Sequence, residues 1–345
     1  MTEFDLTGLG WSAHFARQLG DDDRGLAPAR LSEVHRDRLR ALAPGGALSL
    51  LPVESTGAYA VGDWVLSDGS RAVRRLDPTS DLTRRAAGRE AKLQRIAANV
   101  DTLGIVTSCN ADFNIARLER YLALAHTAGC LPLVVLTKAD MARDADDYLR
   151  RAQRLSPLVT AIALDATDPE EVARLAPWCK DGQTLALVGS SGVGKTTLRN
   201  TLTGEHELTQ GIREDDAKGR HTTTARSLVP TQAGGWLIDT PGMRELQLAD
   251  ADEGIGAVFE DIEDLARQCR FRDCAHAGEP GCAVQAAIET GALDPDRLAR
   301  WDKLRREDRY NSETVAEARA RGKAFGKMVR EISTSKKRRH DPGAP

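Results

Sequence analysis

The sequence predicts an α/β fold in its central part, preceded by a small β-barrel and followed by a helical, cysteine-containing segment. Three observations carry this prediction. Short apolar pieces, punctuated by Gly, Pro and Asp, fill residues 30–85, and apolar runs alternate with helix-length stretches from about residue 100. Three clustered cysteines follow residue 250. Strands that alternate with helices build a parallel sheet with both faces covered.

The composition describes an ordinary packed protein. The chain has 345 residues, enough for two or three domains, with 41% hydrophobic and 29% charged residues. No apolar run reaches the ~18 residues that a membrane-spanning helix needs. The acidic N-terminus lacks the basic region of a signal peptide. We therefore expect a cytoplasmic monomer with no membrane partner.

The N-terminal part divides into two segments. Residues 1–25 are rich in Gly and Asp and hold few apolar anchors, so we expect a mobile segment. From residue 26 to 95 the spacing of turn residues indicates several short strands in a small barrel or sandwich. The pieces that carry this pattern are 30–39, 46–54, 61–69 and 71–78.

The central part, residues 96–250, alternates strand and helix patterns. The expected strands are 102–108, 131–137, 160–166, 184–190 and 235–241, and the clearest helix-length stretches are 116–129 and 142–155. Apolar runs of this length with polar ends are typical of strands buried in a parallel sheet.

A phosphate-binding loop follows the fourth of these strands. The pattern G-x-x-x-x-G-K-[ST] is matched in full by Gly189, Ser190, Ser191, Gly192, Val193, Gly194, Lys195 and Thr196, and Thr197 continues into the helix. Glycines allow backbone N–H groups to turn toward phosphates, and the helix N-terminus adds partial positive charge. Lys195 is expected to reach the β- and γ-phosphates, and the Thr196 hydroxyl to ligate Mg²⁺.

A second phosphate-sensing motif, Asp-Thr-Pro-Gly, ends the last expected strand. Asp239 is expected to hold the Mg²⁺ shell, and Gly242 to bring its N–H to the γ-phosphate. The next residue is Met243, where many GTPases place a Gln. Because a thioether cannot orient a water molecule, we expect slow intrinsic hydrolysis.

The segment "GRHTTT" lies between these two motifs. Thr223 is the favoured threonine to close over a nucleotide and complete the Mg²⁺ shell, with Thr222 and Thr224 as alternatives. His221 is a candidate for positioning the attacking water, since its pKa lies near neutrality. It can equally well pack or cap the segment, which by itself is also compatible with a polar turn.

Residues 137–140, Thr-Lys-Ala-Asp, predict a reader of the guanine base. The Asp140 carboxylate can accept from guanine N1–H and its amino group, a donor pair that adenine lacks. Lys138 can lay its aliphatic stem along the base, with Ala139 between the two. Thr137 stands where Asn is commoner, and its hydroxyl can still tie the loop to its neighbours.

The order of these motifs is unusual for a GTPase. The base reader comes first, then a weakly matching second base loop at 161–166, then the phosphate loop, the switch threonine and Asp-Thr-Pro-Gly. Because domain termini are often close in space, such a permutation can leave the sheet intact. We hypothesise that nucleotide state is relayed to the segment that follows the last motif.

The cysteines fall into two classes. A tetrahedral zinc set is offered by Cys269, Cys274, His276 and Cys282. Three thiolates and one imidazole leave no open position for a catalytic water, so a structural zinc is the better interpretation. The alternative is coincidental clustering with a surface His. The remaining cysteines lie in or beside apolar segments and are expected to be small buried residues: Cys109, Cys130 and Cys179.

The C-terminal end is basic. Residues 300–339 hold 14 Lys/Arg and 6 Asp/Glu, whereas the whole chain has a net charge of −3. Helical spacing extends over 295–332. A basic end on an acidic body favours a polyanionic partner, although a solvated helix face with a disordered tail explains the charge equally well.

Together these motifs resemble the ribosome small subunit-dependent GTPase A family, circularly permuted GTPases that act in late assembly of the 30S subunit. The matching stretches are "VGDWV", "RRAAGREAKLQRIAANVDTLGIVTS", "DFNIARLERYLALA", "VVLTKAD", "GSSGVGKTTL", "GRHTTTARSL", "IDTPGMREL" and "CRFRDCAHAGEPGCAV". The resemblance implies an α/β P-loop GTPase domain, circularly permuted, with an N-terminal β-barrel (OB-fold) and a C-terminal α-helical zinc-binding domain.

It also implies GTP hydrolysis stimulated by the small subunit, with 16S rRNA as the main contact. The expected boundaries are 26–95 for the OB-fold, 96–250 for the GTPase domain, 251–335 for the zinc-binding domain and 336–345 for a basic tail.

Two other functions are compatible with a phosphate-binding loop. A nucleotide-dependent RNA-binding module, in which hydrolysis only times release, fits the same motifs. A metabolic P-loop enzyme such as a nucleotide kinase fits poorly, because the guanine reader and Asp-Thr-Pro-Gly are present and no small-substrate site is evident.

Overall fold

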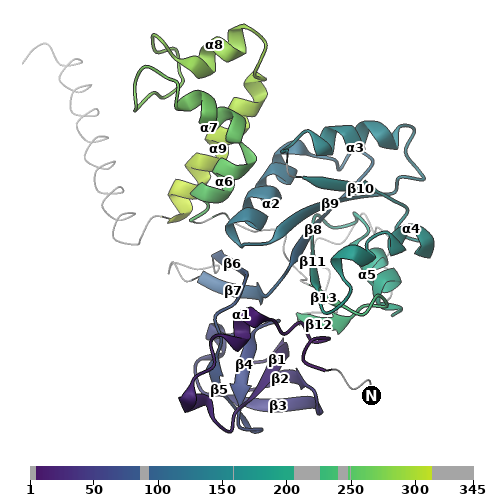
Figure 1. Ribbon diagram of the computed structural model, residues 1–345. Coiled ribbons are helices and arrows are strands. Elements are labelled where there is room, and N and C mark those ends of the chain that lie inside the picture. The colour runs from purple at the N-terminus through teal and green to yellow at the C-terminus, as the bar shows by residue number, and fades with distance from the viewer. Residues whose placement is uncertain are drawn as a thin grey trace, which may run out of the picture.

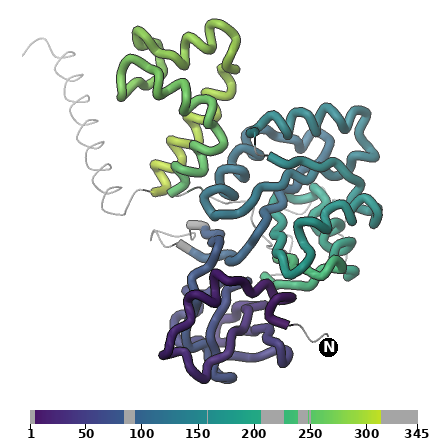
Figure 2. The backbone as a smooth tube through the Cα atoms, in the orientation of Figure 1, coloured from purple at the N-terminus to yellow at the C-terminus, as the bar shows by residue number. Residues whose placement is uncertain are grey.

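The computed structural model describes residues 5–85, 93–157, 159–205, 226–239, 248 and 250–312. Within these ranges the chain forms a barrel, a central α/β part and a helical C-terminal part (Figure 1). The backbone trace in Figure 2 places the barrel and the C-terminal helices at opposite ends, with the α/β part between them. Among the described residues no helix is both long and apolar enough to cross a membrane.

Five short strands close the N-terminal barrel. They are β1 (Ala27–Val34), β2 (Leu39–Ala43), β3 (Gly46–Pro52), β4 (Trp64–Ser67) and β5 (Arg71–Arg75), in the order β1-β2-β3-β5-β4. Only the β3–β5 pair of this barrel is parallel. Inward side chains such as Leu31, Leu39 and Leu50 are fully buried. A closed barrel of five strands in this order is an OB-fold, which confirms that part of the predicted fold.

The segment before the barrel is packed, which differs from the mobile segment predicted for residues 1–25. Within residues 5–25 lie α1 (Ala13–Ala16) and the 3₁₀ turn η1 (Asp21–Asp23). Leu9 and Phe15 are 0% and 2% exposed. The Trp11 ring lies 5.4 Å from Phe15 and 4.9 Å from Trp64 of the barrel, centroid to centroid. The packed rings of Trp11, Phe15 and Trp64 therefore anchor this segment, although it contains few apolar residues.

The buried Arg30 joins the barrel to the rest of the molecule. Its guanidinium donates to the carbonyls of Leu9 at 2.7 Å and Asn99 at 3.1 Å, and to the hydroxyl of Thr184 at 2.7 Å. Burial lowers the pKa of Arg30 to about 10, although nearby Asp101 opposes this. One side chain thus holds together the N-terminal segment, the barrel and the strand that leads to the phosphate loop.

Replacing Arg30 by Met is expected to destabilise the protein by about 3–5 kcal/mol, because two carbonyls and a hydroxyl lose their donor in a buried place. Urea unfolding measures the change. Arg36→Met is the matched control, since Arg36 is exposed on the β1–β2 turn. A loss below about 1 kcal/mol in Arg30→Met would contradict the structural role of this contact.

The central sheet is parallel except at one edge. Its order is β10 (Thr160–Ala163), β9 (Leu131–Thr137), β8 (Thr102–Ser108), β11 (Thr184–Val188), β13 (Trp236–Asp239) and β12 (Ser227–Pro230). Only β12 runs antiparallel, against β13. All residues of β8 and β11 are buried. This confirms the predicted parallel sheet with covered faces.

Two sets of helices cover this sheet. Successive strand residues alternate between them: Leu136 packs in the core that includes α2 (Ile115–Thr127) and α3 (Ala145–Gln153). Val135 packs in the core that includes α4 (Pro169–Ala173) and α5 (Lys195–Thr203). The three isolated cysteines, Cys109, Cys130 and Cys179, are 5%, 5% and 0% exposed, as predicted for small buried residues.

The remaining elements connect and extend these parts. They are η2 (Thr56–Ala58), the hairpin strands β6 (Asp81–Arg85) and β7 (Leu93–Ala98), η3 (Ala176–Trp178), and the C-terminal helices α6 (Asp252–Val258), α7 (Glu260–Ala266), α8 (Ala283–Glu289) and α9 (Pro295–Ser312).

The C-terminal helices dock on α2 of the central part. Gly254 of α6 lies so close that a Cβ there would come within 2.2 Å of the Ala123 carbonyl oxygen. Beside this contact the Glu119 carboxylate, 0% exposed, accepts from Arg297 at 3.1 Å and Arg300 at 2.7 Å of α9. Burial raises the pKa of Glu119, and the two guanidinium groups oppose that shift. The interface is therefore both closely packed and charge-paired.

Candidate nucleotide site and metal cluster

The predicted phosphate loop connects β11 to α5. Gly189, Gly192 and Gly194 have φ of 143°, 78° and 92°, a region that disfavours other residues. A Cβ at Gly189 would lie 2.1 Å from the carbonyl oxygen of Val106 on the neighbouring strand. The glycines therefore let the backbone turn back tightly onto the N-terminus of α5, which leaves N–H groups facing the loop.

Lys195 lies inside this loop. Its ammonium donates to the Gly189 carbonyl at 2.8 Å and to the Ser190 carbonyl. The side chain is partly buried, whereas Thr196 next to it is exposed. A cation enclosed by backbone carbonyls at a helix N-terminus is placed to exchange them for phosphate oxygens.

The Thr-Lys-Ala-Asp loop is hydrogen-bonded directly to the phosphate loop. The buried Thr137 hydroxyl donates to the Val193 carbonyl at 2.6 Å, and lies 3.2 Å from the Thr107 carbonyl. Lys138, with φ of 57°, donates from its ammonium to the Gly192 carbonyl at 2.9 Å. The predicted tie between Thr137 and its neighbours is confirmed, and it joins the two motifs that the sequence separates.

The loop after β10 lies beside the same site. The Ala139 N–H donates to the Leu164 carbonyl at 3.4 Å, and the Leu164 N–H donates to Leu136 at 2.9 Å. The carboxyl ends of β9 and β10 thus present their loops together, at the edge where ligands of parallel sheets bind. Burial, with the added charge of Asp140, raises the pKa of the Cys109 thiol to about 11, so this thiol stays protonated near the base loop.

The structure describes only part of the region that was predicted to contact the γ-phosphate and Mg²⁺. The backbone of Asp239 pairs with Leu187 on β11, which brings the end of β13 next to the phosphate loop. The other predicted residues of this region lie outside the described part of the chain: His221, Thr222, Thr223, Thr224, Gly242 and Met243.

Sequence reasoning missed the loop that follows β8. Cys109 donates its N–H to the Thr137 carbonyl at 2.9 Å, and the Ser108 hydroxyl donates to Asn110 at 2.8 Å. This loop therefore borders the nucleotide site. The sequence did contain a signal for this loop. The apolar run of β8 predicts a buried parallel strand, and the carboxyl end of such a strand lies at the same edge of the sheet as those of its neighbours.

The clustered cysteines and His276 come together as predicted. Their four ligand atoms all lie within 4.8 Å of one another. His276 Nδ1 is 3.7 Å from Cys269 Sγ and 3.5 Å from Cys282 Sγ, and the two sulfurs are 3.9 Å apart. A tetrahedral zinc ion with ordinary bond lengths needs sulfurs about 3.8 Å apart and a nitrogen about 3.6 Å from each sulfur. The distances among Cys269, His276 and Cys282 match this geometry, and Cys274 lies close enough to be the fourth ligand of a zinc-sized ion.

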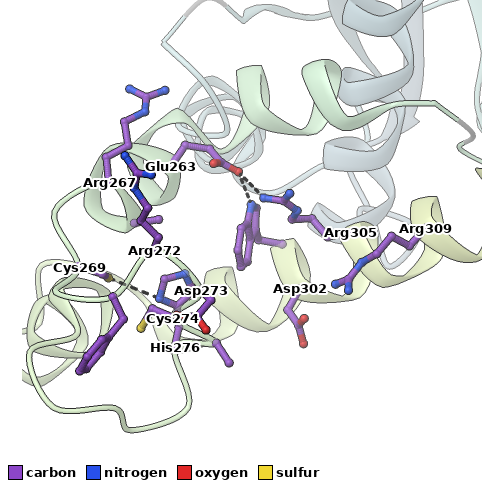
Figure 3. A pocket seen from close by; sticks show the side chains of 14 residues that line it. Glu263, Arg267, Cys269, Arg272, Asp273, Cys274, His276, Asp302, Arg305 and Arg309 are labelled. Atoms are coloured by element: carbon purple, nitrogen blue, oxygen red, sulfur yellow. Dashed lines mark hydrogen bonds and ion pairs between the residues drawn. The ribbon is translucent and has the colours of Figure 1, made fainter.

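Local hydrogen bonds shape the loop that carries these ligands. The Glu279 carboxylate accepts from the N–H groups of Ala275 and Ala277, both at 2.8 Å. This clamp supports His276, whose φ is 55°. Figure 3 shows Cys269, Cys274 and His276 pointing toward one another. The Trp301 ring of α9 lies 5.7 Å from the imidazole, so the cluster also contacts the last helix.

Comparison with known proteins identifies the family of this chain. The RsgA GTPase family matches residues 76–249. A small ribosomal subunit biogenesis GTPase RsgA from Mesorhizobium japonicum is 55% identical over 315 residues, 89% of this chain and 91% of the relative. Small ribosomal subunit biogenesis GTPase RsgA 2 from Vibrio vulnificus is 48% identical, with 97% of both chains covered.

Two solved structures share the fold at low sequence identity. YjeQ from Thermotoga maritima has a TM-score of 0.61 at 22% identity, covering 81% of this chain and 97% of that one. YloQ, described as a circularly permuted GTPase, has a TM-score of 0.59 at 22% identity, covering 86% and 99%. The barrel, the permuted order of the nucleotide motifs and relatives at about half identity lead to one conclusion: this chain belongs to the RsgA GTPase family.

Proposed function

We propose that this protein binds the 30S ribosomal subunit and acts in its late maturation, hydrolysing GTP to GDP and phosphate with stimulation by the small subunit. The observation that carries the proposal is the direct hydrogen bond from Thr137 of the guanine reader to Val193 of the phosphate loop. This hydrogen bond brings together two motifs whose order along the chain is permuted, so that they can form one nucleotide site. The names of its relatives, small ribosomal subunit biogenesis GTPases, supply the partner.

The nucleotide is assigned to both loops. GTP is held by Thr137, Lys138, Ala139, Asp140, Gly189, Ser190, Ser191, Gly192, Val193, Gly194, Lys195, Thr196, Thr197, Asp239 and Gly242. Mg²⁺ would be held with GTP by Thr196, Thr223 and Asp239. It would neutralise charge on the β- and γ-phosphate oxygens.

Catalysis is assigned to groups around the γ-phosphate. Lys195 stabilises the transferred phosphoryl group, Thr223 closes over it, and His221 is the candidate that positions the attacking water. Met243 cannot take that last role. Intrinsic turnover is therefore slow until a partner arranges the segments that carry His221 and Thr223.

The metal of the cluster is proposed to be one structural zinc ion per chain. Cys269, Cys274, His276 and Cys282 supply four protein ligands, so no position remains for a catalytic water. The proposed domains are an OB-fold over 26–95, the permuted GTPase domain over 96–250 and the zinc-binding domain over 251–335, followed by a basic tail over 336–345.

The decisive test compares GTP hydrolysis with and without purified 30S subunits. A large stimulation by 30S, sensitive to salt because 16S rRNA is the contact, is the expected result. An unstimulated rate with intact 30S binding would favour the alternative, a nucleotide-dependent RNA-binding module in which hydrolysis only times release. Absence of 30S binding in both GTP-analogue and GDP states would remove the ribosomal assignment.

Asp140→Asn is expected to lower GTP affinity by about 10- to 150-fold, because a carboxylate that accepts two hydrogen bonds becomes an amide that accepts at only one atom. Xanthine carries a carbonyl where guanine has an amino group, so the variant should gain affinity for XTP. Titration with fluorescent nucleotides measures both. Asp146→Asn on α3 is the control and should leave both affinities unchanged.

A further inference from the structure

An open cleft of about 770 Å³ lies in the C-terminal part, beside the metal cluster (Figure 3). One wall is the end of α7 with the cysteine loop, and the other is one face of α9. Arg267 and Arg272 extend from the first wall, and Arg305 and Arg309 from the second. None of the nucleotide-site residues lines it, so the cleft is separate from the proposed GTP site.

The carboxylates of this cleft are largely engaged by other groups. Glu263 accepts from the Trp301 indole at 3.0 Å and from Arg305 at 3.1 Å. Asp302 pairs with Arg306, which does not line the cleft, at 2.5 Å. These acids fix the position of α9 and its tryptophan and do not neutralise the remaining arginines.

Two guanidinium groups stay available on opposite walls. Arg272 and Arg309 are both exposed, and in the described ranges neither has an ion-pair or hydrogen-bond partner. Asp273 is the one lining carboxylate that is not engaged by a cation there. A guanidinium group is planar and permanently charged, and it can donate two parallel hydrogen bonds to the oxygens of a phosphate. Two such groups on opposite walls of an open cleft are therefore suited to bind phosphates.

An exposed aromatic ring stands next to these cations. Phe271 lines the cleft, is 43% exposed, and lies 5.4 Å from the guanidinium carbon of Arg270. An exposed flat ring flanked by arginines is the combination on which unpaired bases stack. An acidic peptide would use the arginines and leave the ring without a role.

The metal cluster would position this ring and one of the arginines. Phe271 and Arg272 lie between Cys269 and Cys274, two of the four ligands. A bound ion would fix both ends of this short loop and limit the conformations that the two side chains must give up on binding.

We propose that the cleft is a binding subsite for single-stranded RNA, in which Arg272 and Arg309 hold backbone phosphates and Phe271 stacks on an unpaired base. The proposal rests on the proposed function, since the RNA of the small subunit would bring such a segment to this protein.

The test uses the full-length protein and a short, mixed-sequence, fluorescein-labelled single-stranded RNA, with binding measured by anisotropy at several KCl concentrations. R272Q/R309Q should lower affinity at low salt. It should also reduce the slope of log K against log salt by about 1.4, since each phosphate contact on a single strand contributes ~0.7. F271A should weaken binding by roughly 5- to 150-fold at every salt concentration and leave the slope unchanged.

The matched control is R154Q/K303Q, which removes the same charge from exposed residues that do not line the cleft. We expect its affinity to stay within about twofold of the unmodified protein. Equal losses in both double variants would mean that only net charge matters and would overturn the proposal. So would a loss of poly-glutamate binding with unchanged RNA binding, which would favour an acidic protein partner.

Stimulation of hydrolysis by 30S subunits is measured separately on the same variants. A stimulated enzyme whose R272Q/R309Q form binds RNA normally overturns the cleft proposal alone. An unmodified protein that neither binds nor responds to 30S subunits overturns the proposed function, and the cleft proposal with it.

Discussion

Lys195→Ala is expected to lower the rate of GTP hydrolysis by roughly 10³- to 10⁵-fold, the range found for a cation that stabilises the transferred phosphoryl group. The ammonium lies inside the phosphate loop, where it donates to the Gly189 carbonyl at 2.8 Å. It is therefore placed before the nucleotide arrives, and no side-chain ordering is needed at the moment of reaction. Single-turnover hydrolysis of limiting GTP by excess enzyme, with saturating 30S subunits, measures this effect.

The variant should remain folded, because Lys195 is only partly buried and its ammonium donates to carbonyls of its own loop. Nucleotide affinity should also fall, since a positive charge facing the phosphates is lost. Lys180→Ala is the control: Lys180 pairs with exposed Asp181 and lies outside the loop. A Lys195→Ala enzyme within tenfold of the unmodified rate would remove Lys195 from the catalytic machinery.

The sequence predicted those parts of the site whose chemistry is local. The phosphate loop was predictable because its glycines are required by backbone geometry within a few residues, as the φ of 143° at Gly189 shows. The ligands of the metal cluster were predictable because thiols and an imidazole at short spacing have few other uses. The parallel sheet followed from continuous apolar runs, and every residue of β8 is indeed buried.

The features that could not be predicted from the sequence depend on contacts between residues that are far apart along the chain. Trp11 and Phe15 looked like isolated residues in a polar segment, and their burial requires Trp64 of the barrel. Nothing near Arg30 in the sequence indicates its burial, since its acceptors lie 21 to 154 residues away. No local pattern distinguishes a buried arginine from an exposed one when its partners are backbone carbonyls.

The same limit applies to the cleft beside the metal cluster. The arginines of α9 read as one basic helical stretch in the sequence. The structure separates them into groups with different roles: Arg297 and Arg300 pair with the buried Glu119, whereas Arg305 and Arg309 line the cleft. The excess of positive charge therefore has two uses, one in docking the C-terminal helices and one on an open surface.

Cys282→Ser is expected to release the metal and unfold the C-terminal helices that depend on it. Cys282 caps the N-terminus of α8, where its sulfur accepts from the Gln285 N–H at 3.4 Å, so its loss removes both a metal ligand and a helix cap. The apparent binding free energy of a structural zinc ion, about 10–16 kcal/mol, is comparable to the whole stability of a domain. Thermal unfolding and the zinc content per chain report the loss together.

The contrast with the nucleotide site makes this prediction discriminating. Guanine nucleotide binding should persist in Cys282→Ser, because Thr137 joins the phosphate and base loops to each other and the cluster residues belong to neither loop. Cys130→Ser is the control: it alters a buried thiol outside the cluster, so it should keep one zinc ion and lose at most a few kcal/mol of stability.

A Cys282→Ser protein that retains a full zinc complement would show that three ligands suffice and that the cluster is not a closed structural site. If zinc is lost but the C-terminal helices stay folded, packing of α6 on α2 and the Glu119 ion pairs must hold them without the metal.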